Sequence, residues 1–507
     1  MEQKNLNKII LILSGVTVII HLFAVIWGQY GIFRDELYYI ACANHPEFGY
    51  VDQPPLSIWI LSGWITIFGD TLFSIRFLPA IFSGAATFLI GTLAKEFGGQ
   101  KYAVILACFA SMLAPIFLGF FSVYNMNFWE IVLWPIVFLI MMRIVISTKS
   151  KYWIWIGLLI GFGALNKISM LWLGAGIFIG IILTSDRTML RSWAPWLAGL
   201  LALIIFSPFI FWNITHDFAH LEFIRNAATE KYASQNPITF FSGLLLLMNP
   251  MAAPIWLAGF WFLLSNKEHR IIGFSVVFVL VLLLINIHSK AEYFTSAMTA
   301  LLPAGAVQLE KIFQGRFRSW IRIPYLSLVI LMGILLIPMT LDVLPVPTFT
   351  RYMSATGLSA PSTEGKKLES LPQFFADRFG WRNMAVSAAK VYKTLSESEK
   401  RNTLIFCRNY GEAGAIEYFG RESDLPPVIS PHNSYWYWSL KYLNQNATFI
   451  FIGVKNDKLN EIFEETTEAG TIYTEHAMPY ENNLPIIICR KAKTSIFELW
   501  KKKKMFI

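Results

Sequence analysis

Residues 8–55 hold the pattern on which the fold depends: KIILILSGVTVIIHLFAVIWG at 8–28, followed by QYGIFRDELYYIACANHPEFGYVDQPP at 29–55. The first part is apolar and long enough to cross a bilayer, which takes about 20 residues. The second part contains four acids close to this span, among them Asp35, Glu36 and Asp52. Carboxylates beside hydrocarbon are costly and are typical of functional positions. The sequence therefore predicts a membrane span followed by a loop that carries functional residues.

The same apolar character continues through the first two thirds of the chain. Of 507 residues, 55% are hydrophobic, 16% aromatic and only 15% charged, which is typical of a polytopic α-helical membrane protein. About eleven spans are expected, near residues 8–28, 75–94, 102–122, 127–147, 152–166, 168–184, 193–212, 239–264, 271–287, 294–310 and 323–342. The shorter apolar stretch 54–69 follows Pro54-Pro55 and is expected to form a helix that lies at the membrane interface.

The net charge of +9 could indicate nucleic-acid binding, but the placement of the 42 basic residues indicates a membrane topology instead. If residue 1 lies in the cytoplasm, the loops that follow inside are rich in lysine and arginine, and the outer loops are poor in them. This bias predicts that the first loop, 29–74, lies outside the cytoplasmic membrane. Lys4 and Lys8 precede the first apolar run, and no small-residue cleavage site follows it, so a retained signal anchor is expected.

The composition changes after Asp342, where charged residues become frequent and no further stretch is long enough to span a bilayer. We therefore expect a transmembrane domain at 1–342 and a soluble, extracytoplasmic α/β domain at 343–507, here termed the cap. Its expected strands and helices are short apolar runs at 403–407, 448–453 and 485–489, and helical patterns at 371–395 and 458–468. The run Lys501–Lys504 either meets acidic headgroups or polymers or is simply solvated.

The four cysteines include no C-x-x-C pair, which excludes zinc-finger and thioredoxin-like motifs. Cys407 and Cys489 lie in the expected soluble domain. They form either a disulfide or a pair of buried thiols.

Asp35 and Glu36 are neighbours in sequence, so on a helix their side chains diverge by about 100° and cannot both face one substrate. We expect one of them to act and the other to support it, and Glu36 is also a candidate for binding substrate. Asp52 returns to the same region, and Pro54-Pro55 can start the next helix at little cost. The alternative is a surface loop whose acids are merely solvated.

Six short motifs connect this loop with later parts of the chain. They are Asp35-Glu36, Asp52-Gln53-Pro54-Pro55, Arg76-Phe77-Leu78-Pro79, Leu165-Asn166-Lys167, Thr215-His216-Asp217 and Ser289-Lys290-Ala291-Glu292-Tyr293. Together they resemble the GT-C type of membrane glycosyltransferase, specifically the dolichyl-phosphate-mannose protein mannosyltransferases and the bacterial lipid A aminoarabinose transferases. The stretches 409–415 and 430–436 resemble the cap of bacterial members. The resemblance implies a GT-C fold and transfer of a sugar, with inversion, from a polyprenyl phosphate to an acceptor outside the membrane.

The resemblance also implies a role for Asp35 as the catalytic carboxylate, since a hydroxyl acceptor needs a base in the transition state. Asp52 and Gln53 are expected to bind substrate, although many relatives have Lys where this chain has Gln53. A second acid that relatives often carry corresponds to Asn127. Glu130 lies about one helical turn further along and is the candidate for that part, the alternative being an ordinary polar residue at the end of a span.

A departing polyprenyl phosphate gains charge as the glycosidic bond breaks, so cations are expected near it. Lys167 and Lys290 are the two best candidates, and the polar cluster around Lys290 adds Glu292 and Tyr293 as substrate-binding residues. Simple snorkelling of a lysine to the headgroups is the alternative for each. Arg34 and Arg225 are weaker candidates because interfacial arginines commonly meet lipid phosphate.

His216 and His220 are four residues apart, which would put both on one helix face. With Asp52 they could bind a divalent metal such as Zn²⁺, Mg²⁺ or Mn²⁺. An amphipathic interfacial helix without any metal explains the same spacing, and no cofactor is required by the sequence.

The expected partners are a polyprenyl-phosphate-linked sugar, membrane lipids and an acceptor in the cell envelope, whether protein, lipid or glycan, but not a nucleic acid. Trp436, Tyr437 and Trp438 either stack on sugar rings or form a buried cluster. A transporter or flippase of a lipid-linked saccharide is the rival function. Transporter sites usually lie near the bilayer midplane, whereas the acids of this chain gather at one membrane face.

Overall fold

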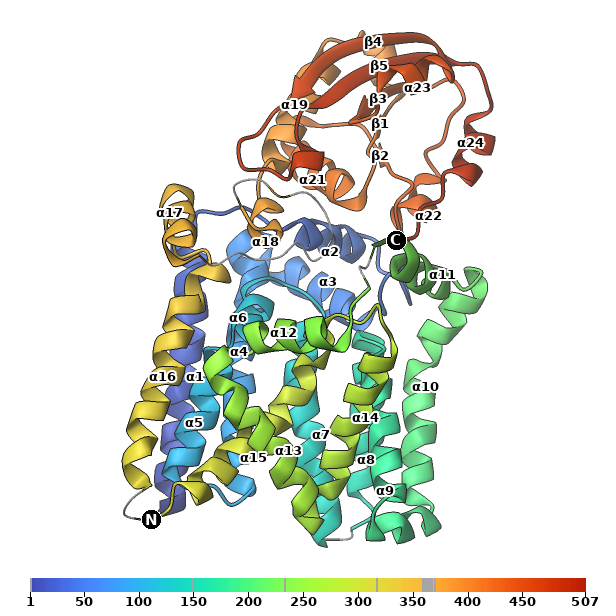
Figure 1. The fold of residues 1–507 in the computed structure, drawn as a ribbon. Coiled ribbons are helices and arrows are strands. Elements are labelled where there is room, and N and C mark those ends of the chain that lie inside the picture. The colour runs from blue at the N-terminus through green and yellow to red at the C-terminus, as the bar shows by residue number, and fades with distance from the viewer. Residues whose placement is uncertain (1, 148, 232–233, 316–317, 358–367, 369–370) are drawn as a thin grey trace.

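The computed structural model describes residues 2–147, 149–231, 234–315, 318–357, 368 and 371–507. It has two parts, a bundle of long helices and a smaller domain with a sheet that covers one end of the bundle (Figure 1). The smaller domain is the cap. The acidic segment 28–55 lies at the junction of the two parts.

Six segments in the described part of the chain are long and apolar enough to cross a membrane. They comprise α1 (Glu2–Trp27), α4 (Leu72–Glu96), α7 (Asn127–Ser147), α10 (Ala194–Thr215), Lys267–Ile285 with α14 (Arg270–Ile285), and Ser319–Met339 with α16 (Arg322–Leu336). Apolar side chains such as Leu11, Ile19, Leu203 and Leu331 are exposed on the outside of these helices. This surface suits contact with lipid.

Three further apolar segments are bent pairs of helices. They are α5 (Lys101–Met112) with α6 (Pro115–Ser122), bent by 58°, α9 (Met170–Ile182) with a 3-10 turn at Ser185–Arg191, bent by 110°, and α12 (Pro237–Leu247) with α13 (Ala253–Ser265), bent by 102°. Prolines follow two of the breaks. Pro115 and Pro250 lack an N–H and so start a new helix more readily than they continue an old one.

Within the described residues, the criterion of length and apolarity gives six spans, or nine if each bent pair counts as one span. By this criterion the expectation of eleven spans is wrong. The two expected spans that fall outside this count are 152–166 and 294–310. They form α8 (Tyr152–Asn166), which has only 15 residues, and α15 (Thr295–Ile312), which is less apolar. Both helices nevertheless pack inside the bundle, α8 against α10 and α15 against α13.

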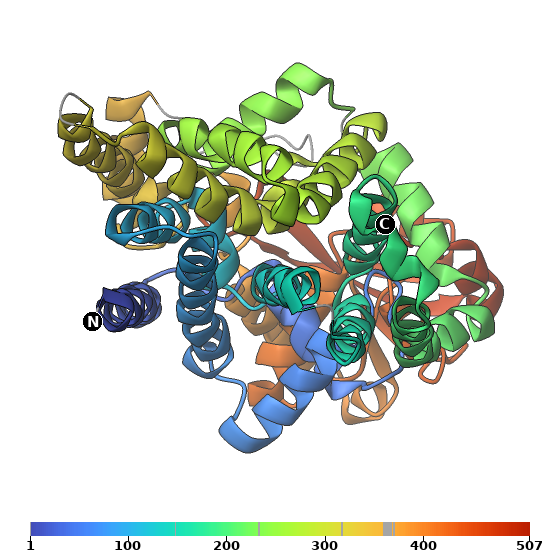
Figure 2. The same cartoon turned by 90° about the horizontal axis from the view of Figure 1, so that it is seen from below.

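Small residues allow α13 and α15 to pack with their backbones in contact. A Cβ atom at Gly305 would lie 1.6 Å from the carbonyl oxygen of Ile255, and one at Gly259 would lie 2.2 Å from that of Leu301. Such close approach is typical of helix pairs in membranes. Seen from below, α12–α16 lie along one side of α4, α5 and α7 (Figure 2).

Two short helices lie at the end of the bundle nearest the cap (Figure 1). These are α2 (Arg34–Asn44) and α3 (Leu56–Phe68), and α3 corresponds to the helix expected at 54–69. A third short helix, α11 (Ala219–Asn226), follows α10 on the same level.

The cap contains a five-stranded sheet in the order β2-β1-β3-β5-β4. Its strands are β1 (Thr403–Phe406), β2 (Val428–Ile429), β3 (Thr448–Ile452), β4 (Phe463–Ile472) and β5 (Leu484–Ala492). Strand β1 is parallel to β2 and β3, whereas β5 is antiparallel to β3 and β4. The helices of the cap are α17 (Val346–Thr356), α18 (Gln373–Ala376), α19 (Trp381–Lys393), α20 (Glu397–Lys400), α21 (Tyr410–Gly420), α22 (Tyr435–Ser439), α23 (Asn456–Asn460) and α24 (Ile496–Lys502).

The three expected strands are present, but both expected helices of the cap need correction. The helix expected at 371–395 is interrupted between α18 and α19, where Gly380 has a φ of 94°. The helix expected at 458–468 is wrong, because α23 ends at Asn460 and β4 begins at Phe463. Glutamates suggested a helix there, but β4 is an edge strand with exposed Glu and Thr side chains, and Thr favours strands.

All four cysteines are free and buried, so Cys407 and Cys489 form no disulfide. The basic run at 501–504 begins in α24, and Lys504 Nζ lies 2.7 Å from Glu222 Oε2 of α11. Trp438 is buried and stacks on His45 at 4.4 Å between ring centroids. The aromatic run 436–438 thus belongs to the packing between the cap and the bundle.

Candidate active site

A cavity of about 500 Å³ lies between the cap and the bundle. Most of the residues expected to form a site line it, namely Asp35, Asp52, Gln53, Asn127, Lys167, His220, Lys290, Glu292 and Tyr293. Its wall also includes Tyr38, Trp172, Phe223, Leu282, Leu283, Tyr410 and Asn433. Residues far apart in sequence therefore meet in one space that is lined by both charged and apolar side chains.

Asp35 lies in the first turn of α2 and is the acid of the first loop expected to carry the chemistry. Its side chain is 41% exposed. Its Oδ1 accepts a hydrogen bond from the Tyr410 hydroxyl at 2.8 Å and lies 3.5 Å from Nε of Arg34. The Tyr410 hydroxyl and the Arg34 guanidinium thus hold this carboxylate in place at the start of α2.

Glu36 does not line the cavity, so its expected role in binding substrate is corrected. It is fully buried and accepts hydrogen bonds from Nη2 of Arg76 at 2.8 Å, from Nε of Arg76 at 3.0 Å, and from the backbone N–H groups of Phe33 and Tyr124. Burial alone would raise the pKa of Glu36, but the charge of Arg76 and these hydrogen bonds outweigh it and lower the pKa. Glu36 therefore fixes α2 to the bundle.

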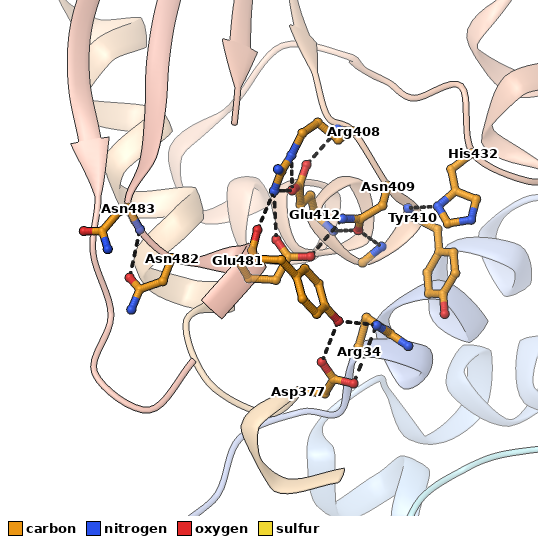
Figure 3. A network of polar contacts seen from close by, with 12 residues as sticks. Arg34, Asp377, Arg408, Asn409, Tyr410, Glu412, His432, Glu481, Asn482 and Asn483 are labelled. Carbon is orange, nitrogen blue, oxygen red and sulfur yellow. Dashed lines mark hydrogen bonds and ion pairs between the residues drawn. The ribbon is translucent and has the colours of Figure 1, made fainter. Parts of the chain in front are cut away.

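Arg34 also lies outside the cavity lining, which corrects its expected contact with substrate. Its Nη1 donates to the Tyr480 hydroxyl at 2.6 Å and lies 3.6 Å from Oδ2 of Asp377. Figure 3 shows Arg34 directed toward Asp377, below the polar cluster of the cap. Arg225 belongs to α11 and does not line the cavity either.

The turn before α3 places two polar side chains in the cavity wall. Asp52 Oδ1 accepts a hydrogen bond from the Tyr38 hydroxyl at 2.9 Å, and the backbone N–H of Tyr50 donates to the carbonyl of Gln53 at 3.0 Å. Gln53 is 1% exposed, and its Nε2 has no hydrogen-bond partner among the described residues. A buried amide donor without a partner is costly, so this nitrogen is suited to a ligand oxygen.

Lys167 is fixed by its neighbours from α7. Its Nζ donates to Oδ1 of Asn127 at 2.8 Å and to Oε2 of Glu130 at 3.1 Å. Glu130 is buried, also accepts a hydrogen bond from Ser169, and does not line the cavity. Its expected part as a second acid that meets substrate is therefore corrected to a support for Lys167.

Lys290 and Tyr293 line the cavity together with Lys167. The Nζ of Lys290 is 3.7 Å from Oε1 of Glu292, and the Nζ of Lys167 is 5.3 Å from the centroid of the Tyr293 ring. Both lysines line the cavity. The cavity therefore presents two cationic side chains to an anionic ligand.

The metal site expected from Asp52, His216 and His220 is not formed. Among the described residues, no three His, Cys, Asp or Glu side chains are grouped so as to hold a metal ion. The two histidines do not share a helix face, because α10 ends at Thr215 and Asp217 and Phe218 both have positive φ angles. His216 stacks on Trp212, whereas His220 pairs through Nδ1 with the carbonyl of Val51 at 2.9 Å.

Burial lowers the pKa of His220 to about 4, so its ring is neutral near neutral pH. Because Nδ1 faces a carbonyl, it carries the proton, and Nε2 is left as an acceptor at the cavity wall.

Sequence reasoning missed the contribution of the cap to this cavity. Tyr410 and Asn433 come from the stretches 409–415 and 430–436, which carried part of the family resemblance, yet nothing in their local sequence indicated that they would meet Asp35. The apolar lining residues Trp172, Phe223, Leu282 and Leu283 were equally unmarked, because apolar residues are common throughout the spans.

Comparisons with known proteins agree with the motifs. Residues 52–212 match the sequence model of the dolichyl-phosphate-mannose-protein mannosyltransferases. The crystal structure of ArnT from Cupriavidus metallidurans bound to undecaprenyl phosphate aligns with a TM-score of 0.60 at 11% identity and covers 94% of this chain and 97% of that one. Its apo form aligns with the same score at 10% identity and the same coverage. No curated protein matches the chain in sequence.

A structure of the Archaeoglobus fulgidus oligosaccharyltransferase also aligns, with a TM-score of 0.48 at 12% identity, over 82% of this chain and 63% of that one. The expected fold class is confirmed by the ArnT alignment, which extends over almost the whole chain. The chain is therefore a polytopic membrane protein with the GT-C glycosyltransferase fold, and its residues 52–212 carry the sequence pattern of the dolichyl-phosphate-mannose-protein mannosyltransferases.

Proposed function

We propose that this protein is an inverting glycosyltransferase that moves a sugar from a polyprenyl-phosphate donor to an acceptor in the cell envelope. The observation that carries the proposal is the composition of the cavity between cap and bundle. The carboxylate of Asp35, whose side chain is 41% exposed, lines the same space as two lysines, Lys167 and Lys290, and that space also has apolar walls. A base, a pair of cations and an apolar wall are what transfer from a lipid phosphate requires.

Asp35 acts as the general base. As the acceptor oxygen attacks the anomeric carbon, its proton passes to the carboxylate of Asp35, the new glycosidic bond forms, and the bond between the sugar and the phosphate oxygen breaks with its electron pair leaving on that oxygen. Attack from the side opposite the phosphate inverts the anomeric carbon. An acceptor that is already an anion would be oriented by Asp35 instead.

Lys167 and Lys290 bind the phosphate and stabilise the charge that it gains. Cations that are held in place before the reaction stabilise a developing anion without reorganisation. Lys167 meets this condition through its contacts with Asn127 and Glu130. The amide of Gln53 supplies a further donor at the position where many relatives of this class have Lys.

The apolar lining provides a place for the first isoprene units of the donor. Trp172, Phe223, Leu282 and Leu283 line the same cavity as the two lysines. The alignment with an ArnT structure that holds undecaprenyl phosphate supports a polyprenyl carrier for this chain as well. The bias of basic residues toward the opposite loops supports an orientation with the cavity and the cap outside the cytoplasmic membrane.

Mass spectrometry of envelope lipids, glycans and glycoproteins from cells that express wild-type protein or the Asp35→Asn variant tests the proposal. The matched control is Asp186→Asn, because Asp186 lies in the turn after α9, outside the cavity lining. Loss of one defined sugar mass in Asp35→Asn alone, at equal protein levels, is the expected result and identifies sugar and acceptor. Unchanged products in Asp35→Asn would refute the proposal, and a lipid-linked sugar that only changes membrane side would favour a flippase.

A further inference from the structure

The cap approaches the acidic loop through two glycines of α21. A Cβ atom at Gly411 would lie 2.5 Å from Cγ of Arg34, and one at Gly414 would lie 3.0 Å from Cβ of Leu37. Any larger residue at these positions would push α21 away from α2. The helix that carries Asp35 and the helix that begins with Tyr410 are therefore packed very closely.

The start of α21 is held by a buried polar cluster in the cap (Figure 3). The Asn409 side chain accepts hydrogen bonds from the N–H groups of Gly411 and Glu412 at 2.9 and 3.0 Å, and donates to Glu481 at 2.8 Å. The Arg408 guanidinium binds the carboxylate of Glu412, with its Nε at 2.9 Å. These contacts cap the helix and fix the residue that follows Asn409, which is Tyr410.

Tyr410 is thereby oriented onto the bundle. Its ring lies 4.8 Å from that of Tyr38 and 4.7 Å from that of His432, with the Arg34 guanidinium 5.5 Å from its centroid. Only 8% of the residue is exposed. Its hydroxyl donates to Oδ1 of Asp35 at 2.8 Å. Among the described residues of the cap, Tyr410 alone forms a hydrogen bond with Asp35.

We infer that Tyr410 is a positioning residue through which the cap orients the carboxylate of Asp35 toward the acceptor. The inference rests on the proposed function. The hydroxyl of Tyr410 donates its hydrogen bond to Oδ1 of Asp35, and among the described residues Oδ2 accepts no hydrogen bond. The hydroxyl of Tyr410 thus fixes the rotation of the carboxylate and leaves Oδ2 as the oxygen that receives the proton. The cap is part of the active site rather than an attached binding module.

The kinetic test is Tyr410→Phe, which removes the hydroxyl and keeps the ring. A hydrogen bond to a charged group contributes about 1.5–3 kcal/mol, which corresponds to a fall in kcat of about tenfold to a hundredfold if it orients the base. The KM for the lipid donor should change less than about twofold, because Lys167 and Lys290 are untouched. Tyr435→Phe is the matched control, since Tyr435 is a buried tyrosine of the cap that bonds Glu417 at 2.6 Å and lies outside the lining of this cavity.

A kcat of Tyr410→Phe equal to that of the wild type would overturn the inference. An equal fall in kcat in Tyr410→Phe and Tyr435→Phe would also overturn it, because such a result would show a general effect of either substitution on the cap. Wild-type protein and Asp35→Asn are measured in the same assay. If the wild type transfers no sugar, the proposed function fails by that result alone.

A double-mutant cycle on thermal stability tests the contact without any substrate. It uses Asp35→Ala, which removes the acceptor oxygen entirely. The shifts in melting temperature of Asp35→Ala, Tyr410→Phe and the double variant should be non-additive, whereas the same cycle with Tyr435→Phe should be additive. Additive shifts for Asp35 and Tyr410 would show that the hydroxyl does not hold the carboxylate and would overturn the inference, whatever the activity of the protein.

Discussion

Replacing Glu36 with glutamine should destabilise the protein strongly, although the two side chains have nearly the same shape. The side chains of Glu36 and Arg76 are 0% and 2% exposed and meet at 2.8 Å. The carboxylate also accepts hydrogen bonds from the N–H groups of Phe33 at 2.9 Å and Tyr124 at 3.0 Å. It therefore ties the start of α2 and the connection before α7 to one arginine of α4.

The magnitude follows from what the substitution leaves behind. The glutamine side chain would keep one acceptor oxygen and would turn an NH2 group toward donors. Arg76 would then stay buried without a carboxylate beside it, with one amide oxygen and the carbonyl of Gly31, at 3.1 Å, as acceptors. Breaking a buried ion pair from one side costs about 3–5 kcal/mol. Because the total stability of a domain is about 5–15 kcal/mol, a large fraction of it would be lost.

The assay is thermal unfolding in detergent or nanodiscs, followed by tryptophan fluorescence. Glu36→Gln should melt well below the wild type at pH 7, and Glu36→Gln with Arg76→Met should recover part of the loss, since a buried pair can be replaced by apolar groups. The pKa of Glu36 is lowered in the folded protein, so its stabilisation is present above the unfolded value of 4.5 and is lost as the pH falls below it. The melting temperatures of the wild type and of Glu36→Gln should therefore converge at acidic pH.

The control is Asp35→Asn, which changes the neighbouring, partly exposed acid. It should leave the melting temperature almost unchanged, because the amide oxygen can still accept the hydrogen bond from Tyr410. If Glu36→Gln melts within about 2 °C of the wild type at pH 7, the reasoning that Glu36 is a structural acid is refuted.

Three further predictions concern the cavity, the cap and the bundle. Lys290→Ala should raise the KM for the lipid donor about tenfold and leave the KM for the acceptor nearly unchanged, which steady-state kinetics with each substrate varied can check. Burial and the nearby charge of Glu412 raise the pKa of Glu481 in the folded protein. The carboxyl group of Glu481 therefore stays protonated to a higher pH in the folded protein than in the unfolded chain, and the free energy of unfolding falls as the pH rises above the unfolded value of 4.5. Glu481→Gln should therefore melt above the wild type at pH 8 but not at pH 4.5, and a wild-type advantage at pH 8 would contradict this. Gly305→Val should prevent the contact between α13 and α15 and reduce the yield of folded protein in detergent. Gly199→Val in α10 should leave the yield nearly unchanged, because a Cβ there has no neighbour within 4 Å.

Much of the fold could be predicted because membrane spans depend on local composition. Long apolar runs and short motifs such as Asp52-Gln53-Pro54-Pro55 predicted the GT-C fold, which the comparison with ArnT confirms. Errors arose where short elements depend on their surroundings. The glutamates of β4 favour a helix in isolation, but pairing with β5 decides the conformation of this segment.

The candidate site was predictable only in part, for a similar reason. The offset of about 100° between Asp35 and Glu36 on a helix indicated that only one of the two acids could face substrate. Which acid does so depends on Arg76, forty residues after Glu36, because Arg76 binds the Glu36 carboxylate. Sequence spacing placed His216 and His220 on one helix, and two left-handed residues between them prevent it. The hydrogen bond from Tyr410 to Asp35 joins positions 375 residues apart, and no local pattern predicts such a contact.

The close packing of α21 on α2 has a consequence for the making of the protein. Residues 1–342 leave the ribosome and can enter the membrane long before Tyr410 is synthesised, so for that time the acid of α2 has no partner from the cap. With Asp35 as the base, we expect the inserted but unfinished chain to use lipid donor at least about tenfold more slowly than the finished protein, because the carboxylate is still unoriented. Completion of the cap would then limit premature use of a lipid-linked sugar, and full activity would begin only when the last third of the chain has folded onto the first loop.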